Sequence, residues 1–461
     1  MAQPEDLLAA TPGLLAEAAA RAARYVAEVG DRPVPPSPDA LGALERFVEP
    51  LPAGPGDPAD VLAVLDDVGS PATLASTGGR YFGFVIGGVQ PPALAAAWLA
   101  AAWDQNAALP AMSPVAAVLH DVVQGWLVDL LGLPGGTAAA FVTGATVANA
   151  TALAAARDKV LLDASWDAPG QGLFGAPPVT IVVGEQVHTT VRKALAMLGL
   201  GRDRIVRVPS DDQGRLRADA LPDVDGPVVV CAQAGEVNSG AFDPFPAIVE
   251  WARARNAWVH VDGAFGLWAL ADPDRFPVAG LAGADSWATD AHKWLNVTYD
   301  SGVCFVRDPE DLRRTFAAAA GYLPPDDGFE AMHHTPQSSQ RARQVEVWAV
   351  LRTLGRDGVV DLVRRTCAQA RRLAERLSAA GLEVRNDVVL NQVLVSAADD
   401  ALTSALVAAV QADGTCWCGP TVWRGRTAMR ISVSSWRTTD ADIEASADAI
   451  IRLAEGLAAG R

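Results

Sequence analysis

The stretch "SWATDAHKWLNVTYDSG", residues 286–302, contains one of only three lysines in a chain of 461 residues. The others are Lys159 and Lys193, and arginine supplies the rest of the basic side chains. Lys293 follows a short apolar run typical of a buried strand, so we expect its amine just beyond the end of that strand. An amine that can lose its proton performs chemistry that arginine cannot. The plain alternative is a surface lysine that lies along apolar side chains.

The composition disfavours several classes of function. A formal net charge of −17 opposes binding to nucleic acid or to an anionic membrane surface. No apolar stretch reaches the ~18 residues that a membrane span needs, and the N-terminus lacks the pattern of a targeting peptide. Five scattered cysteines favour a reducing compartment. We therefore expect a cytoplasmic protein without a membrane or nucleic-acid partner.

Seven short apolar runs alternate with helical patterns in the middle of the chain. They are residues 138–143, 179–184, 204–209, 227–233, 257–262, 285–290 and 302–307. Buried strands separated by helices predict an α/β fold with a mostly parallel seven-stranded sheet. Ligands of such sheets bind beyond the carboxyl ends of the strands, so the residues that follow each run are the candidates for function.

The flanking sequence predicts two further parts. Residues 1–85 show one amphipathic helical pattern, near 5–29, and Pro-rich connectors, which is too little apolar sequence for a separate core. Residues 336–461 combine long helices with short strands, which is typical of a smaller α+β domain. We expect an N-terminal segment (1–85) that packs on another domain or on a partner subunit, a large domain (86–335) and a small C-terminal domain (336–461).

Four of the predicted strand ends carry polar groups. "GATVAN" opens a helix after residue 143, so its backbone amides and the hydroxyl of Thr146 can bind an anion. His188, Asp262 and Lys293 follow three other strands. The alternative for His188 is a structural histidine, and the alternative for Asp262 is a helix cap or a turn. Together, an anion cradle, a ring for stacking, a carboxylate and a lysine match the requirements of pyridoxal phosphate.

The same segments resemble a known family. "GATVAN", "EQVHTTVRKALAMLGLG", "VNSGAFDP", "WVHVDGAFG" and "ADSWATDAHKWL" are similar, in order and spacing, to motifs of the group II pyridoxal-phosphate decarboxylases, which include aromatic L-amino-acid and glutamate decarboxylases. The resemblance extends from about residue 79 to about residue 443. It implies the fold type I aminotransferase architecture and a homodimer with active sites at the interface. Residues 1–85 would then be an N-terminal dimerisation segment, and residues 86–335 would bind pyridoxal phosphate.

The resemblance also implies a role for each matching residue. Lys293 would carry the cofactor, His188 would stack on its ring, and Asp262 would pair with the ring nitrogen. Further cofactor contacts are expected from Gly144, Ala145, Thr146, Ala264, Asp290, His292 and, across the subunit interface, Gly355. Substrate contacts are expected from Tyr81, Phe82 and Arg430, with a structural role on its strand as an equal alternative for Arg430.

Two features depart from the family pattern. Glu236 and Val237 stand where family members have threonines. The segment "DDGFEAMHHTPQSSQRAR", which matches a mobile loop that carries a proton-donating tyrosine in the family, contains no tyrosine, and Tyr322 lies upstream of it. His333 and His334 lie close to the expected position, and a histidine can donate a proton near neutral pH. Loop histidines without any role are the alternative.

The sequence thus favours a pyridoxal-phosphate enzyme that decarboxylates an L-amino acid, with an aromatic or otherwise apolar side chain, to the amine and carbon dioxide. Because the loop acid is missing, oxidative deamination to an aldehyde, aldolase-type cleavage and transamination stay open. A binding protein that has lost catalysis is a further alternative, against which the set of Lys293, His188 and Asp262 argues.

Overall fold

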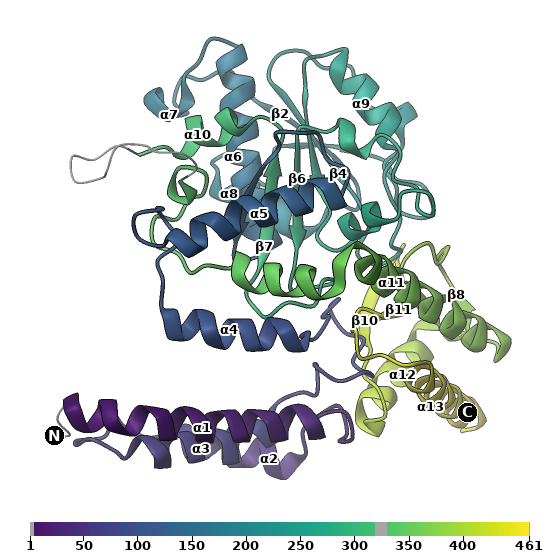
Figure 1. The fold of residues 1–461 in the computed structure, drawn as a ribbon. Coiled ribbons are helices and arrows are strands. Elements are labelled where there is room, and N and C mark those ends of the chain that lie inside the picture. The colour runs from purple at the N-terminus through teal and green to yellow at the C-terminus, as the bar shows by residue number, and fades with distance from the viewer. Residues whose placement is uncertain (1–3, 319–329, 461) are drawn as a thin grey trace.

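A seven-stranded sheet organises the middle of the chain (Figure 1). The computed structural model describes residues 4–318 and 330–460. The strands across the sheet are β1 (Ala138–Val142), β7 (Gly302–Val306), β6 (Ser286–Asp290), β5 (Trp258–Asp262), β4 (Val228–Gln233), β2 (Thr180–Gly184) and β3 (Ile205–Val208). β7 runs antiparallel to both neighbours, and the other pairs are parallel. The predicted α/β fold with a mostly parallel seven-stranded sheet is confirmed.

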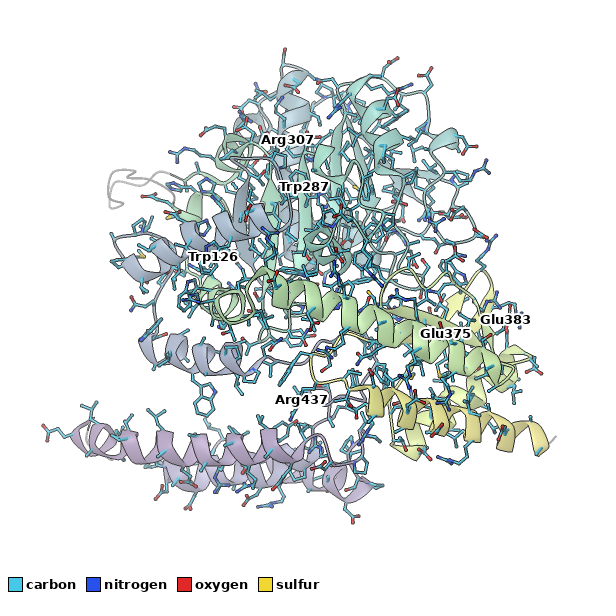
Figure 2. The ribbon with its side chains drawn as sticks, turned by 45° about the vertical axis from the view of Figure 1, so that its right-hand side comes forward. Trp126, Trp287, Arg307, Glu375, Glu383 and Arg437 are labelled. Carbon is cyan, nitrogen blue, oxygen red and sulfur yellow. The ribbon has the colours of Figure 1, made fainter. Side chains whose placement is uncertain are left out.

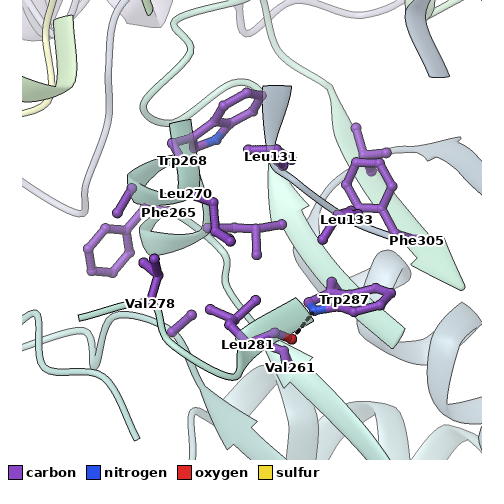
Figure 3. Close-up of a cluster of buried hydrophobic side chains, with 14 of the residues drawn as sticks. Leu131, Leu133, Val261, Phe265, Trp268, Leu270, Val278, Leu281, Trp287 and Phe305 are labelled. Atoms are coloured by element: carbon purple, nitrogen blue, oxygen red, sulfur yellow. Dashed lines mark hydrogen bonds between the residues drawn. The ribbon is translucent and has the colours of Figure 1, made fainter. Parts of the chain in front are cut away.

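Side chains of each strand alternate between two cores because successive residues of a strand point to opposite faces. Trp287 and Phe305 enter a core that includes residues of α5 (Pro114–Leu130) and α9 (Phe245–Arg253). Ala288 and Cys304 enter the opposite core, under α6 (Ala145–Asp163) and α8 (Thr189–Met197). Figure 3 shows part of the first core, in which the Trp287 indole donates a hydrogen bond to the Leu281 carbonyl at 3.0 Å. Burial on both faces explains why the strands are nearly continuous apolar runs.

A second, smaller sheet follows toward the C-terminus. Its strands lie in the order β10 (Gly419–Trp423), β11 (Arg426–Ser432), β9 (Gln392–Ser396) and β8 (Glu383–Val384), and all pairs are antiparallel. α12 (Asp400–Asp413) and α13 (Asp440–Ala459) pack with it. The sequence predicted the α+β character of this part but missed β10, whose residues alternate between partly exposed and exposed positions.

One long helix connects the two sheets. α11 (Gln344–Ala379) packs against α4 (Pro91–Trp103) and α5 near its start, and against α13 near its end. The helix is kinked at Gly355, where φ is 62°, and the sequence had indicated two helices here. Because α11 contacts both parts, the domain boundaries stay a prediction. The remaining short helices are α7 (Ala168–Gln171) and α10 (Pro309–Phe316), with single 3-10 turns at Ala218–Ala220, Gly266–Ala271, Leu281–Gly283 and Ala331–His333.

The N-terminal helices form a layer of their own below α4 (Figure 1). α1 (Pro4–Glu28) agrees with the predicted helix, and the structure adds α2 (Pro38–Ala43), a 3-10 turn at Leu44–Phe47, and α3 (Pro58–Ala72). α3 begins in Pro-rich sequence because Pro58 occupies its first position and the Asp57 carboxylate accepts the amide of Ala59 at 2.8 Å. Arg437, labelled in Figure 2, ties this layer to the rest by donating to the Val26 carbonyl at 3.2 Å.

Among the described helices, none combines the length and the apolar character that crossing a membrane requires.

Candidate active site

Lys293 lies three residues beyond the end of β6, beside the last residue of that strand. Its Nζ is 2.9 Å from Oδ2 of Asp290, whose side chain is buried. The other carboxylate oxygen of Asp290 accepts the backbone amide of Ala145, at the start of α6, at 2.5 Å. β6 and α6 thereby meet at Asp290, and the amine of Lys293 is held next to the N-terminus of α6.

The first turn of α6 has the form of an anion cradle. Gly144 precedes it with a φ of 155°, and a Cβ there would approach His292 and Asp290 at 3.1 and 3.2 Å. The hydroxyl of Thr146 forms no hydrogen bond with any residue in 4–318 or 330–460. Gly144, Ala145 and Thr146 thus lie together with Asp290 and His292, as the sequence predicted, and the helix dipole favours negative charge at this end.

His292 faces both Asp290 and Tyr299. Its Nδ1 accepts the backbone amide of Ser301 at 3.1 Å, so the neutral ring carries its proton on Nε2, which is 3.5 Å from Oδ1 of Asp290. The ring of Tyr299 packs on the imidazole with centroids 4.3 Å apart. Burial, and secondly the charge of Lys293, lower the pKa of His292, although Asp290 opposes the shift.

His188 is held at the start of α8. Its Nδ1 accepts the amide of Thr190 at 3.3 Å, which makes it the N-terminal cap of this helix. Burial lowers its pKa, while the charges of Asp262, Lys293 and Arg430 also act on the ring. His188 therefore has a structural role as a helix cap, and this cap also orients the ring among the charged groups expected to surround the cofactor.

Asp262 ends β5 with a buried carboxylate that is only 5% exposed. Its Oδ1 accepts the amide of Ala264 at 3.2 Å, and Ala264 in turn accepts the amide of Asp290 through its carbonyl at 2.8 Å. Within the described part of the chain, no cation forms an ion pair with this carboxylate. A buried charge without a partner is costly, so the site is short of one positive charge at this position.

Arg430 reaches the same region from β11 of the C-terminal sheet. Burial lowers its pKa, and the charge of Glu236 opposes that shift. Glu236 is buried and accepts hydrogen bonds from Asn238 and Ser239 of its own turn, and burial raises its pKa. Arg430 donates weakly to the Val237 carbonyl at 3.5 Å. Glu236 and Val237, which replace the two threonines of the family, thus form a turn that is stabilised by hydrogen bonds to the Glu236 carboxylate. Arg430 lies next to this turn.

Tyr81 and Phe82, predicted together as substrate contacts, point in different directions. Tyr81 stacks on Trp417 with centroids 5.1 Å apart and planes at 14°. Phe82 is 1% exposed and lies in the core of the C-terminal sheet. Successive residues of extended backbone face opposite sides, so Tyr81 faces toward Trp417 and Phe82 faces away. The structure corrects the prediction that the side chain of Phe82 lines a substrate pocket.

Three residues that the sequence assigned to the site, His333, His334 and Gly355, have their described contacts with other parts of the chain. Nε2 of His333 is 3.0 Å from the Ala318 carbonyl and its Nδ1 is 3.1 Å from the Glu330 carboxylate. Nδ1 of His334 is 2.9 Å from the Glu330 carbonyl, and charges on α10 act on its ring. Both rings are buried. Gly355 lines a surface hollow between α5 and α11, next to Trp126 (Figure 2).

The structure also identifies neighbours that the sequence reasoning missed. Tyr299 was present in the quoted lysine stretch but was given no role. Trp417 belongs to "CWC", in which the two flanking cysteines are buried and the indole faces the opposite side, toward Tyr81. The alternation of cysteine, tryptophan and cysteine along the chain was the sequence pattern that could have indicated this. Gly87 lies against the lysine stretch so closely that a Cβ would overlap the carbonyl oxygen of Lys293. The segment after Tyr81 therefore packs against the backbone of Lys293.

These residues fit pyridoxal phosphate. Asp262 lacks a cation, which the protonated ring nitrogen of the cofactor would supply, and the α6 cradle offers amide and hydroxyl donors for its phosphate. Lys293 supplies the amine that would hold it covalently. His188 and Ala264 would lie against its ring.

Comparison with known proteins agrees with this assignment. Residues 65–396 match the model of the pyridoxal-dependent decarboxylase conserved domain. The chain is 31% identical to L-2,4-diaminobutyrate decarboxylase of Rhizobium meliloti over 383 residues, which cover 78% of this chain and 75% of that protein. This chain belongs to the pyridoxal-dependent decarboxylase family. Pyridoxal phosphate is its cofactor, and the resemblance found in the sequence is confirmed.

Other members of the decarboxylase family differ in the substrate that their names give. An aromatic-L-amino-acid decarboxylase of Bacillus atrophaeus is 26% identical over 352 residues, 70% of this chain and 68% of that one. An acidic amino acid decarboxylase of Xenopus tropicalis is 29% identical over 313 residues, 65% of this chain and 60% of that one. The Oryza sativa TDC structure with PLP and tryptamine has a TM-score of 0.90 at 21% identity, covering 99% of both chains, which shows the shared fold.

Proposed function

We propose that this decarboxylase acts on an L-amino acid with an aromatic or otherwise apolar side chain and produces the amine and carbon dioxide. The observation that carries this proposal is the aromatic wall formed by Tyr81, Phe84 and Trp417. Tyr81 and Phe84 pack on the Trp417 ring at 5.1 and 5.5 Å between centroids. Their segment packs against the backbone of Lys293 at Gly87. Aromatic side chains bind flat apolar groups through burial and stacking.

The charged side chains of the site argue against a substrate with a distal ammonium group, such as diaminobutyrate. Such a group needs a carboxylate that is free to pair with it. Asp290 is paired with Lys293, Glu236 is bonded within its own turn, and Asp300 is paired with Arg343 at 3.0 Å. Arg430 is a partly buried cation whose charge acts on His188, and it would bind the α-carboxylate or, in the acidic alternative, a distal carboxylate.

Different residues of the chain have different roles in the proposed reaction. Pyridoxal phosphate, when bound, supplies an electron sink for the pair left behind as carbon dioxide departs. Lys293 would hold the cofactor, and the negative charge of Asp262 would favour positive charge at its ring nitrogen, which is electrostatic preorganisation of the kind that commonly dominates catalysis. Tyr81 and Trp417 exclude water from the substrate side.

A product analysis over a panel of amino acids tests the proposal. Tryptophan, phenylalanine, glutamate, cysteine sulfinate and diaminobutyrate are each incubated with the loaded enzyme, and carbon dioxide, amine, aldehyde and peroxide are measured. Amine from the aromatic substrates supports the proposal, and Trp417→Ala should raise their KM while leaving glutamate unaffected. Aldehyde with peroxide would favour oxidative deamination, keto acid would favour transamination, and turnover of glutamate alone would favour the acidic alternative.

We also propose a homodimer in which a second copy covers the N-terminal layer and α4. Leu8, Leu15, Trp98 and Trp103 are between 43% and 73% exposed in the single chain, and exposed apolar clusters of this kind mark interfaces. Sedimentation should give twice the chain mass, and Leu15→Glu with Trp103→Glu should halve it. Val422→Glu, at an exposed residue on β10, is the matched control. A cytoplasmic location stays a prediction.

A further inference from the structure

The proposed reaction needs one proton from a group near Lys293. When carbon dioxide leaves, the bond from the α-carbon to the carboxyl carbon breaks, and the α-carbon must gain a proton to become the amine. A positioned acid accelerates such a transfer by about 10²–10⁴-fold. The identity of this acid is a question that rests on the proposed function, because the acid serves that reaction.

The histidines of the site are poor donors of this proton. Burial lowers the pKa of both His188 and His292, so both rings are neutral near pH 7. A neutral imidazole is a far weaker acid than an imidazolium. The remaining N–H of His292 points toward Asp290. His333 and His334 are held by Glu330 and by the segment around α10.

The chain has four tyrosines, and one of them packs on His292, the residue before the lysine. Tyr25 is in α1, where its hydroxyl is 2.9 Å from that of Thr73. Tyr81 is 2% exposed and stacked on Trp417. Tyr322 lies outside the described residues. Tyr299 packs on His292, its side chain is 60% exposed in the single chain, and its hydroxyl forms no hydrogen bond within the described residues.

We propose that the hydroxyl of Tyr299 donates the proton to the α-carbon of the substrate. The Oη–H bond breaks, the electron pair left by carbon dioxide forms the new bond from the α-carbon to hydrogen, and the phenolate regains a proton from solvent. Stacking on His292, the residue before Lys293, fixes the ring at the site. Although the residue is 60% exposed overall, the surrounding chain removes part of the solvent from its phenol. This partial burial, followed by the charge of Asp290 and the neighbouring Tyr81, raises the pKa of Tyr299 to about 12, which keeps it protonated at neutral pH.

Tyr299→Phe tests this role because it removes the hydroxyl and keeps the ring. We expect kcat for amine formation to fall about 100-fold or more, with KM, thermal midpoint and the affinity for pyridoxal phosphate unchanged. Exchange of the α-hydrogen of the product amine in D₂O, followed by NMR, should slow by the same factor, because it is the reverse of the same proton step. Tyr322→Phe is the control and should keep the wild-type rates.

Each other outcome overturns the inference. Wild-type kcat in Tyr299→Phe would remove the proposed donor, and a raised KM with unchanged kcat would make Tyr299 only part of the pocket wall. A loss confined to Tyr322→Phe would assign the proton to that residue. Failure of the proposed function is separate: the wild-type enzyme would then form no amine and carbon dioxide from the aromatic amino acids. The exchange measurement still tests Tyr299 in that case, and wild-type exchange in Tyr299→Phe would refute it.

Discussion

Replacing Asp262 by asparagine should have opposite effects on the chain without cofactor and on the loaded enzyme. Without cofactor, the buried carboxylate has no ion-pair partner among the described residues, and its hydrogen bond comes from Ala264 at 3.2 Å. The asparagine oxygen can accept the same bond. Removing an uncompensated buried charge relieves a desolvation cost of about 1–3 kcal/mol, so the free energy of unfolding of the cofactor-free chain should rise or stay constant.

In the loaded enzyme the same substitution removes the partner of the ring nitrogen. Breaking a buried charge pair costs about 2 kcal/mol or more, which weakens binding about 30-fold. Because stabilisation by a ligand grows as RT ln(1 + [L]/Kd), about 2 kcal/mol of cofactor-dependent stability is lost at a fixed excess of cofactor. Thermal unfolding with and without pyridoxal phosphate, together with an absorbance titration for Kd, measures both effects.

Asp243 supplies the matched control, since it is also a buried carboxylate and is also 5% exposed. Its two oxygens accept the amides of Leu216 and Gln233, both at 2.7 Å. Asp243→Asn turns an NH₂ group toward one of these donors, so the cofactor-free chain should lose about 1–3 kcal/mol and cofactor affinity should not change. The reasoning is refuted if Asp262→Asn destabilises the cofactor-free chain as Asp243→Asn does, or binds the cofactor as tightly as the wild-type protein.

Lys293, His260 and Gly87 each support a further prediction. Lys293→Ala should abolish the visible absorbance of the covalently held cofactor and the adduct trapped by borohydride; an adduct on another lysine would contradict the assignment. Burial holds the pKa of His260 at about 3, below the ordinary 6.5, so folding stability should fall as pH drops below 6.5, by about 1.4 kcal/mol per pH unit. The free energy of unfolding, measured with urea at several pH values between 7 and 5, should depend less steeply on pH in His260→Gln than in the wild-type protein. An equal dependence on pH in the two proteins would contradict this prediction. Gly87→Ala should cost about 1–3 kcal/mol by overlap with the Lys293 backbone, measured by thermal unfolding. Gly125→Ala in α5, where a Cβ meets nothing within 4 Å, should be neutral or stabilising.

The sequence was sufficient to predict the strands and the polar residues at their ends, because each of these features lies within one short segment. The seven apolar runs correspond to the seven strands because burial on both faces demands continuous apolar residues. Polar groups at their ends gather on one side because the carboxyl ends of parallel strands share an edge. Lys293, Asp262 and His188 could therefore be selected from the sequence alone, and so could the family. The edge strand β10 was missed because its pattern is only half apolar.

Contacts between distant segments required the tertiary structure. Only packing shows that Tyr81 faces Trp417 while Phe82 turns into a core, that His333 and His334 are held away from Lys293, and that Tyr299 lies on His292. The pairing of Tyr81 with Trp417 joins residues more than three hundred positions apart, and no local periodicity encodes such a partner. The sequence determined the cofactor, and it also selected the amine that we expect to hold it, because the position of Lys293 just past a strand end can be read from local sequence. The aromatic wall and the proposed proton donor were decided by how the two sheets and the intervening segment pack over Lys293.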